Sequence, residues 1–188
     1  MLKGILSAIG QECVLSGMNN FHRLDTESAP MAVKPIPDGY HSVTPYLYVR
    51  GASDAIAFYE KAFNAVEVMR MDWGGKIGHA EIKIGESPVM LADEFPEQGT
   101  LSPLSLGGAS SSLVIYVEDS DAITEQAIAA GATVLRPIQD QFYGDRSATL
   151  KDPFGHQWTI STHKEDVAPE EMDRRSRELM TKMASGMA

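Results

Sequence analysis

Hydrophobic and polar positions follow the same order twice between residues 44 and 163. In each copy, a short alternating run precedes a segment of helical spacing, and three further alternating runs follow it. The first copy predicts a strand over Pro45–Arg50, a helix from Ser53 to Asn64, and strands over 66–73, 79–85 and 88–93. The second copy predicts a strand over Leu113–Val117, a helix from Ser120 to Gly131, and strands over 133–138, 146–151 and 157–162. The pattern therefore predicts two βαβββ modules.

The repeat is also visible in the residues themselves. The run Ser53–Ile56, Ser-Asp-Ala-Ile, recurs as Ser120–Ile123 at the same place in the second copy. Because serine is a favoured N-cap, Ser53 and Ser120 are the predicted caps of the two helices. Each module covers one sheet face with its helix and leaves the other uncovered, so two modules must pair, and their open faces are expected to form a cleft. The expected fold is α+β, with module one over 44–98 and module two over 111–163.

The segments on either side of the modules have a different character. Residues 1–43 contain prolines and the turn pair Asp38-Gly39, which predicts an N-terminal arm and linker, and no run there is typical of an export signal. Residues 164–188 predict a C-terminal helical tail that begins at Pro169 and carries an apolar stripe. The stripe is either a packing or dimer surface or an adaptable interaction arm, and its residues are Met172, Leu179, Met180 and Met183.

Composition narrows the class of protein and of partner. The 188 residues are 43% hydrophobic and 22% charged, which is typical of a globular protein, and no apolar run is long enough to span a membrane. Sixteen basic and 26 acidic residues give a net charge of −10, so neither a nucleic-acid nor a membrane partner is expected. The single cysteine, Cys13, excludes an internal disulfide and favours a cytoplasmic location.

Strand alternation assigns the polar residues of module one to faces. If Leu47 and Val49 face the helix, then Tyr46 and Tyr48 face the cleft, together with Arg50. In the same way His79, Glu81 and Lys83 share one strand face. This triplet is either a substrate contact, in which His79 beside a carboxylate does acid–base chemistry, or a solvated face of a strand at the sheet edge.

Module two offers a second set of candidates. Asp145 and Arg146 either bind a substrate anion or stiffen the loop, and Tyr143 either donates to an oxygen in the cleft or closes the loop. His156 and Trp158 are expected to pack toward the helix because they alternate with Thr159. The candidates for catalysis are His79, Glu81, Tyr143, Asp145 and Arg146. The candidates for ligand binding are Tyr46, Tyr48, His79, Glu81, Tyr143 and Arg146.

Three runs resemble a known family. The runs Tyr46–Val49 and Ala57–Phe63, and the turn Asp152-Pro153-Phe154-Gly155-His156, resemble the glyoxalase/bleomycin resistance protein/dioxygenase superfamily, also named vicinal oxygen chelate. The run Phe142–Arg146, followed by Trp158, is similar to the PhnB-like subgroup. The resemblance implies a paired βαβββ fold, a homodimer, and enzymes that polarise vicinal substrate oxygens with a divalent metal.

The resemblance also implies four metal-ligand positions, one in each of four strands. In this chain they are occupied by Thr44, Leu91, Ser112 and Thr159, none of which carries a carboxylate or an imidazole. We therefore expect no metal and no other cofactor.

Three functions follow from these observations. The first is a glyoxalase-like protein that binds a small molecule in the cleft without a metal, either as a sequestering or resistance-type binder or as an enzyme. The second is a metal-dependent lyase or dioxygenase with non-standard ligands. The third is a structural or partner-binding dimer that uses the Met-rich tail.

Overall fold

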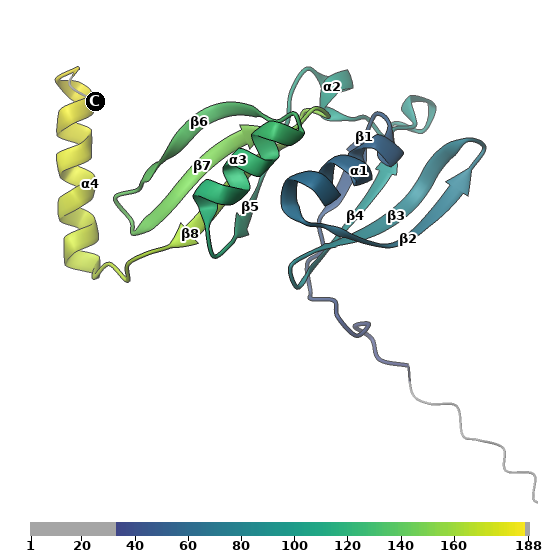
Figure 1. The fold of residues 1–188 in the computed structure, drawn as a ribbon, viewed down its shortest axis with the longest axis horizontal. Helices are drawn as coiled ribbons and strands as arrows, with labels where there is room; N and C mark the ends of the chain where they lie inside the picture. The colour runs from purple at the N-terminus through teal and green to yellow at the C-terminus, as the bar shows by residue number, and fades with distance from the viewer. Residues whose placement is uncertain (1–32, 187–188) are drawn as a thin grey trace, which may run out of the picture. The chain divides into compact units, whose positions relative to one another are not determined.

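Two four-stranded sheets, each carrying one long helix, make up the fold (Figure 1). The computed structural model describes residues 33–186, so most of the expected N-terminal arm lies outside the described residues. Among the helices of the described part of the chain, none has the length and apolar content needed to cross a membrane.

Module one contains the first sheet. Its elements are β1 (Tyr46–Val49), α1 (Ala52–Phe63), β2 (Val66–Trp73), β3 (Lys76–Ile84) and β4 (Ser87–Asp93). The strand order is β1-β4-β3-β2, in which β1 runs parallel to β4 and the other neighbours are antiparallel. A 3₁₀ turn, η1 (Pro96–Gln98), and a short helix, α2 (Pro103–Leu106), follow β4 and lead to module two.

Module two repeats this arrangement. Its elements are β5 (Ser112–Tyr116), α3 (Ser120–Ala130), β6 (Thr133–Asp140), β7 (Asp145–Lys151) and β8 (Gln157–His163). The order β5-β8-β7-β6 and the parallel pairing of β5 with β8 match module one, so the prediction of two βαβββ modules is confirmed. The tail forms α4 (Pro169–Ala184), which begins at the predicted proline.

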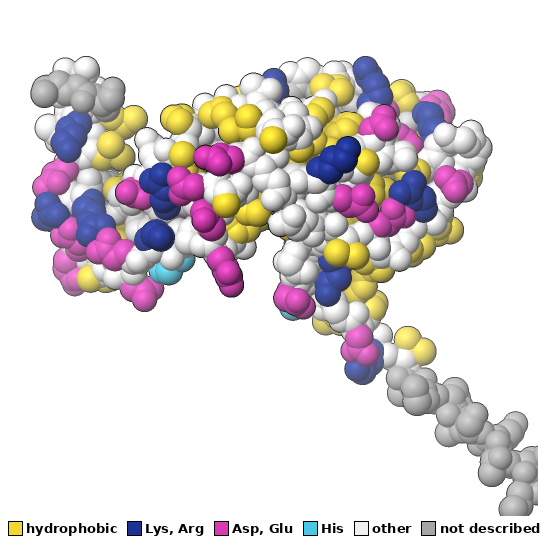
Figure 2. Space-filling model, viewed as in Figure 1, with side chains coloured by type: hydrophobic (Ala, Val, Ile, Leu, Met, Phe, Trp, Pro, Cys, Tyr) yellow, Lys and Arg dark blue, Asp and Glu magenta, His cyan; other side chains and the backbone are white. Residues whose placement is uncertain are grey.

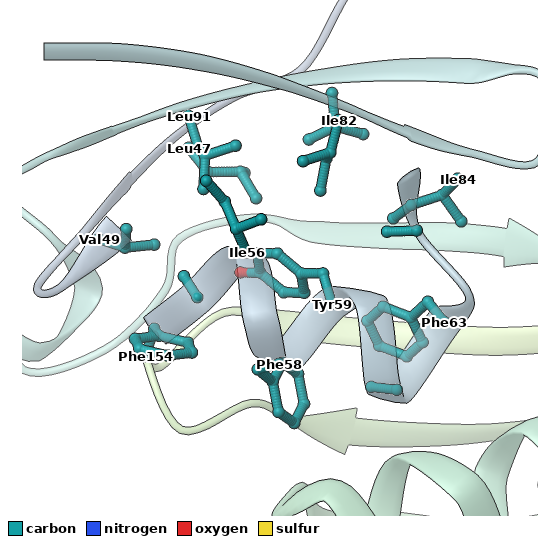
Figure 3. Close-up of a cluster of buried hydrophobic side chains, with 14 of the residues drawn as sticks. Leu47, Val49, Ile56, Phe58, Tyr59, Phe63, Ile82, Ile84, Leu91 and Phe154 are labelled. Atoms are coloured by element: carbon teal, nitrogen blue, oxygen red, sulfur yellow. The ribbon is translucent and has the colours of Figure 1, made fainter. Parts of the chain in front are cut away.

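Helix α1 is buried on two sides. Ile56 lies toward Leu47 and Leu91 of the first sheet, whereas Phe58 lies on the other side of the helix, near Phe154 of module two (Figure 3). The rings of Phe63 and Trp158 lie 4.8 Å apart between their centroids, so aromatic packing joins the two modules. The helix-covered faces of both sheets therefore belong to one core.

One buried carboxylate holds this core together. Asp152 is 2% exposed and lies in the turn between β7 and β8. It accepts hydrogen bonds from the Tyr59 hydroxyl at 2.8 Å, the Trp158 indole Nε1 at 2.9 Å, and the backbone N–H groups of Phe154 and His156 at 2.9 and 2.8 Å. Burial raises the pKa of Tyr59 well above its usual value, so this phenol remains a donor. The carboxylate thus connects α1 of module one to module two.

The predicted helix caps are wrong. The N-cap of α1 is Gly51 and that of α3 is Asp119, not Ser53 and Ser120. Asp93, at the end of β4, accepts from the N–H groups of Gly51 and Ala52 at 2.9 Å each, so a carboxylate distant in sequence caps α1. The α3 cap is local, because the Asp119 side chain accepts from Ala122 N at 3.0 Å.

The two uncovered sheet faces were expected to pair and form a cleft. Because the helix-covered faces share a core, both open faces are turned away from that core. Large apolar side chains remain exposed in the sheets; among them are Met69, Met71, Trp73, Val114 and Tyr116.

The Asp152 carboxylate gives a stability prediction. We expect Asp152→Ala to lower the free energy of unfolding by about 3 kcal/mol or more, because it leaves several buried donors without an acceptor. Tyr59→Phe removes one of four bonds and is expected to cost about 1 kcal/mol. Urea unfolding followed by circular dichroism measures both changes.

The matched control is Asp173→Ala on the exposed surface of α4, with an expected change under about 0.5 kcal/mol. If Asp152→Ala unfolds at the same urea concentration as Asp173→Ala, the carboxylate does not hold the modules together.

Candidate functional site

The open face of module one carries a continuous chain of polar side chains. The hydroxyl of Tyr46 on β1 lies 3.0 Å from Nδ1 of His79 on β3, and Nε2 of His79 lies 3.2 Å from the Glu81 carboxylate. The hydroxyl of Tyr40 donates to the other oxygen of Glu81. Tyr40 and His79 lower the pKa of Glu81, so this carboxylate is ionised at neutral pH.

The order of donors in this chain follows from the carboxylate. An ionised Glu81 accepts hydrogen bonds, which places the imidazole proton on Nε2 of His79 and leaves Nδ1 to accept from Tyr46. The arrangement can transfer a proton between Tyr46 and the imidazole, and it orients the Tyr46 oxygen to accept from a ligand.

The local sequence explains why these groups meet. His79 and Glu81 are two residues apart on β3, so their side chains share one face. β3 lies between β4 and β2, which excludes the alternative that this triplet lines a strand at the sheet edge. Tyr40 ends a turn that begins at Pro37 and is closed by a hydrogen bond of 3.1 Å from the Tyr40 N–H to the Pro37 carbonyl. From the end of this turn the Tyr40 side chain reaches Glu81.

Beside this chain lies a small pocket with aromatic walls. It has a volume of about 150 Å³, and Tyr46, Tyr48, Trp73 and Phe95 contribute its rings. Tyr46 belongs to both features, because its ring lies 5.6 Å from the His79 ring and 5.2 Å from the Tyr48 ring. Tyr46 and Tyr48 were among the predicted ligand-binding residues, but Trp73 and Phe95 were not. A tryptophan at the end of a strand, directly before Gly74-Gly75, was the available signal.

The open face of module two carries a different polar cluster. Asp145 is 5% exposed and accepts from the Tyr116 hydroxyl at 3.0 Å and from Nδ1 of His163 at 2.8 Å. Nε2 of His163 lies 3.0 Å from Asp166. Hydrogen bonds to the two carboxylates, of which the bond to Asp145 has the larger effect, raise the pKa of His163. The raised pKa favours the imidazolium. Tyr143 is 38% exposed and packs edge-on against Phe142, 5.3 Å away.

Arg146 does not reach either open face. It pairs with Thr162 across β7 and β8, on the side covered by α3. Its guanidinium donates to both oxygens of Asp121 at 2.6 and 2.7 Å and to Asp140 at 3.1 Å. These carboxylates raise the pKa of Arg146, and the side chain joins α3 to its sheet. Of the predicted ligand-binding residues, the structure brings together Tyr46, Tyr48, His79 and Glu81.

Charge is mixed on the surface outside these faces. On the face shown in Figure 2, Lys and Arg side chains alternate with Asp and Glu side chains, above all along α4. Within α4, Arg175 donates to Glu165 at 2.8 Å through two nitrogens and anchors the start of the helix.

Residues 39–160 match the sequence profile of the Glyoxalase/Bleomycin resistance protein/Dioxygenase superfamily. The chain belongs to this superfamily. A protein of Mycobacterium bovis, Mb0911c, is 39% identical over 135 residues, which are 70% of this chain and 89% of that protein. Among solved structures, TioX from Micromonospora sp. ML1 has a TM-score of 0.52 and 25% identity over 64% of this chain and 97% of its own. A Bacillus cereus PhnB protein, described as a putative 3-demethylubiquinone-9 3-methyltransferase, has a TM-score of 0.50 and 21% identity over 65% of this chain and 99% of its own.

The metal site that the superfamily resemblance implies does not fit the residues present. Leu91 is 0% exposed and faces the helix, and its aliphatic side chain cannot bind a metal. Its neighbours Met90 and Ala92, which alternate with it, carry no ligand group for a hard cation either. Thr159 lies on the open face, where its hydroxyl is 3.2 Å from that of Thr149. Within residues 33–186 there is no group of three or more His, Cys, Asp or Glu side chains that could hold a metal ion.

The wall of the aromatic pocket depends on Glu94, which gives a pH prediction. Glu94 accepts from Ser105 Oγ at 2.6 Å, Arg50 Nε at 2.8 Å and Ser102 N at 2.9 Å, and these bonds lower its pKa from 4.5 to about 2. A lowered pKa in the folded state adds stability that is complete above 4.5 and is lost as the pH falls through about 2.

We therefore expect Glu94→Gln to be less stable than the natural protein at pH 7, with a difference that shrinks steadily as the pH falls below 4.5. Urea unfolding of both proteins at several pH values measures this difference. The exposed Glu86→Gln serves as control, with a change under about 0.5 kcal/mol at pH 7. A difference that stays constant with pH would show that Glu94 does not stabilise the loop through its charge.

Proposed function

We propose that the protein binds a small organic molecule on the open face of module one and does so without a bound metal. The observation that carries the proposal is the hydrogen-bonded chain of Tyr40, Glu81, His79 and Tyr46, which lies on an uncovered sheet face directly beside an aromatic pocket. Partly buried polar groups next to an apolar pocket are typical of ligand sites. Binding, as in a sequestering or resistance-type protein, requires nothing further.

The same geometry supports a catalytic version of this function. Nδ1 of His79 accepts from Tyr46, so the imidazole can take the Tyr46 proton when that hydroxyl in turn takes a proton from a ligand. Glu81 stabilises the imidazolium that this transfer creates. Module two supplies Asp145 in a separate cluster with Tyr116 and His163, and this cluster is a second candidate for acid–base chemistry.

We place the protein in the PhnB-like subgroup of its superfamily. The run Phe142–Arg146 and Trp158 support this placement, and the fold of the Bacillus cereus PhnB protein agrees with it. We also propose a cytoplasmic location, which the single cysteine, Cys13, supports.

We propose further that two copies form a homodimer. The exposed apolar side chains of module two's open face, Val114 and Tyr116, lie on β5, which leaves one edge of its sheet unpaired. The second half of α4 adds exposed apolar side chains: Leu179, Met180 and Met183 are 37%, 68% and 64% exposed. A second copy of this chain can cover these surfaces, so a different protein is not needed as the partner.

The metal-free site is tested by elemental analysis together with a ligand screen. We expect protein purified without a histidine tag to contain well below one equivalent of zinc, nickel, iron or manganese. In a thermal-shift screen of small organic compounds, we expect ligands whose effect is unchanged by EDTA and is reduced at least about tenfold in apparent affinity by His79→Ala, because a charge-assisted hydrogen-bond network is lost.

Arg146→Ala serves as the control for this screen, because its guanidinium lies on the helix-covered side. We expect this variant to lower the melting temperature without changing ligand affinity. A stoichiometric metal in the open face, with ligand binding abolished by EDTA, would contradict the proposal. It would favour the alternative function, a metal-dependent lyase or dioxygenase.

The dimer is tested by sedimentation velocity at micromolar concentration. We expect a dimer, which needs a contact on the order of 800 Å² per chain, and Val114→Arg on β5 is expected to shift it to monomer while the circular dichroism spectrum is retained. Ile128→Arg on α3, a partly exposed apolar position of module two's helix, is the control and is expected to remain dimeric. A monomer in the natural protein contradicts the proposal.

A further inference from the structure

The aromatic pocket of module one determines what kind of molecule the open face accepts. We infer that it binds a flat aromatic ring that carries a negatively charged group such as a carboxylate. This inference rests on the proposed function and names the chemical class of its ligand.

The pocket has the size and the walls for one ring. Its volume of about 150 Å³ is comparable with cavities that hold a benzene molecule. Tyr46, Tyr48, Trp73 and Phe95 come from β1, β2 and the segment after β4, so aromatic rings approach the pocket from several elements. Aromatic pairs in offset or edge-on contact stabilise each other beyond their buried area, which favours an aromatic over an aliphatic ring.

Trp73 is far more exposed than the other tryptophan of the chain. It is 73% exposed, whereas Trp158, the second tryptophan of the chain, is fully buried and bonded to Asp152. Exposed apolar side chains indicate a binding site when they gather in one place, as Trp73 does with Tyr46, Tyr48 and Phe95. Tryptophan is also frequent among residues that dominate binding energy.

Gly78 makes room for the indole. A Cβ at position 78 would lie 3.2 Å from Cβ and 3.3 Å from Cε3 of Trp73, closer than ordinary contact. Gly78 lies in β3 next to His79, so the absence of a side chain here lets Trp73 lie against the strand at the edge of the pocket. A Cβ at this position would push the indole back by a few tenths of an ångström.

The charge near the pocket selects an anion over a cation. The Lys76 ammonium lies 4.8 Å from the centre of the Phe95 ring and donates to the Glu94 carbonyl at 3.0 Å. Of the nearby carboxylates, Asp93 accepts three backbone N–H groups and Glu94 is paired with Arg50. Glu81, a further carboxylate of this face, accepts from Tyr40 and His79. Because these carboxylates already have donors, the Lys76 ammonium beside the Phe95 ring favours an anionic over a cationic substituent on the ligand.

Tyr46 connects this pocket to the polar chain. Its ring forms part of the pocket wall, and its hydroxyl donates to His79. A ring held between Trp73 and Phe95 therefore has its substituents within reach of both the acid–base chain and Lys76. This combination distinguishes the site from a purely apolar docking surface.

Three matched probes test the inference: benzoate, cyclohexanecarboxylate and benzyltrimethylammonium. Benzoate keeps the flat ring and the charge, the second probe removes the aromaticity, and the third reverses the charge. Binding is measured by isothermal titration and by Trp73 fluorescence, to which the buried Trp158 adds a constant background. A fragment with about nine heavy atoms is expected to bind with a dissociation constant on the order of 1 mM. We expect benzoate to bind at least about fivefold more tightly than cyclohexanecarboxylate because of ring–ring contact. We expect it also to bind more tightly than benzyltrimethylammonium, because the Lys76 ammonium repels a cation.

Variants assign the binding to the pocket. Phe95→Leu, which removes a ring, is expected to weaken benzoate binding by about fivefold or more. Gly78→Ala, which pushes the indole back by only a few tenths of an ångström, is expected to weaken it by less. Lys76→Gln is expected to abolish the preference for benzoate over benzyltrimethylammonium. Val114→Ala, on the open face of module two, is the control and is expected to leave benzoate binding unchanged.

Several outcomes overturn the inference. Equal affinity for benzoate and cyclohexanecarboxylate would remove the aromatic preference, and no binding of any probe would remove the site. If acrylamide quenching of Trp73 falls as protein concentration rises without ligand, a second copy covers the pocket instead. A screen that finds a non-aromatic ligand whose affinity depends on His79 overturns this inference alone, whereas a stoichiometric catalytic metal overturns the proposed function itself.

Discussion

The rest of the structure depends on the Asp152 carboxylate and the four donors that surround it. A carboxylate that is 2% exposed is tolerated in a core only when hydrogen bonds replace its hydration, and here a phenol, an indole and two backbone N–H groups do so. Because the phenol belongs to α1 and the other donors to module two, the polar network can be satisfied only when both modules are packed together. A second link, between His156 Nε2 and the Tyr48 carbonyl at 3.1 Å, lies next to it.

This arrangement explains where the candidate site lies. The shared core occupies the helix-covered side of each sheet, so polar and aromatic groups collect on the opposite faces. The open face of module one has the hydrogen-bonded chain and the aromatic pocket, while that of module two has the Asp145 cluster. The loop that carries Phe95 is held by Glu94, so stability and site geometry are coupled through one more carboxylate.

Local patterns predicted the elements well, because period-2 and helical spacing report directly on which face of an element is buried. Interactions between distant residues were not predictable in the same way. Nothing in the sequence near Gly51 shows that Asp93 caps α1. The run Pro88–Ala92 is apolar throughout, so alternation could not show that Leu91 faces the helix. Strand alternation correctly grouped His79 with Glu81 and placed Trp158 in the core.

The positions of other candidate site residues also depend on tertiary packing. Arg146 pairs with Asp121 because α3 lies over β7, a contact that depends on tertiary packing. Tyr40 and Phe95 reach the site from loops, whose paths the sequence does not determine. Their side-chain types alone did not distinguish them from ordinary loop residues.

The two tryptophans allow one measurement to test the account directly. In a ¹H–¹⁵N spectrum of chelator-treated protein, each indole N–H gives a separate signal. We expect the Trp158 signal to resist exchange in D₂O and to stay unchanged when benzoate is added, because Asp152 holds it in the shared core. The Trp73 signal should exchange rapidly and move with benzoate. A Trp158 signal that exchanges as fast as that of Trp73, or a Trp73 signal that responds only after a divalent metal is added, would contradict the account.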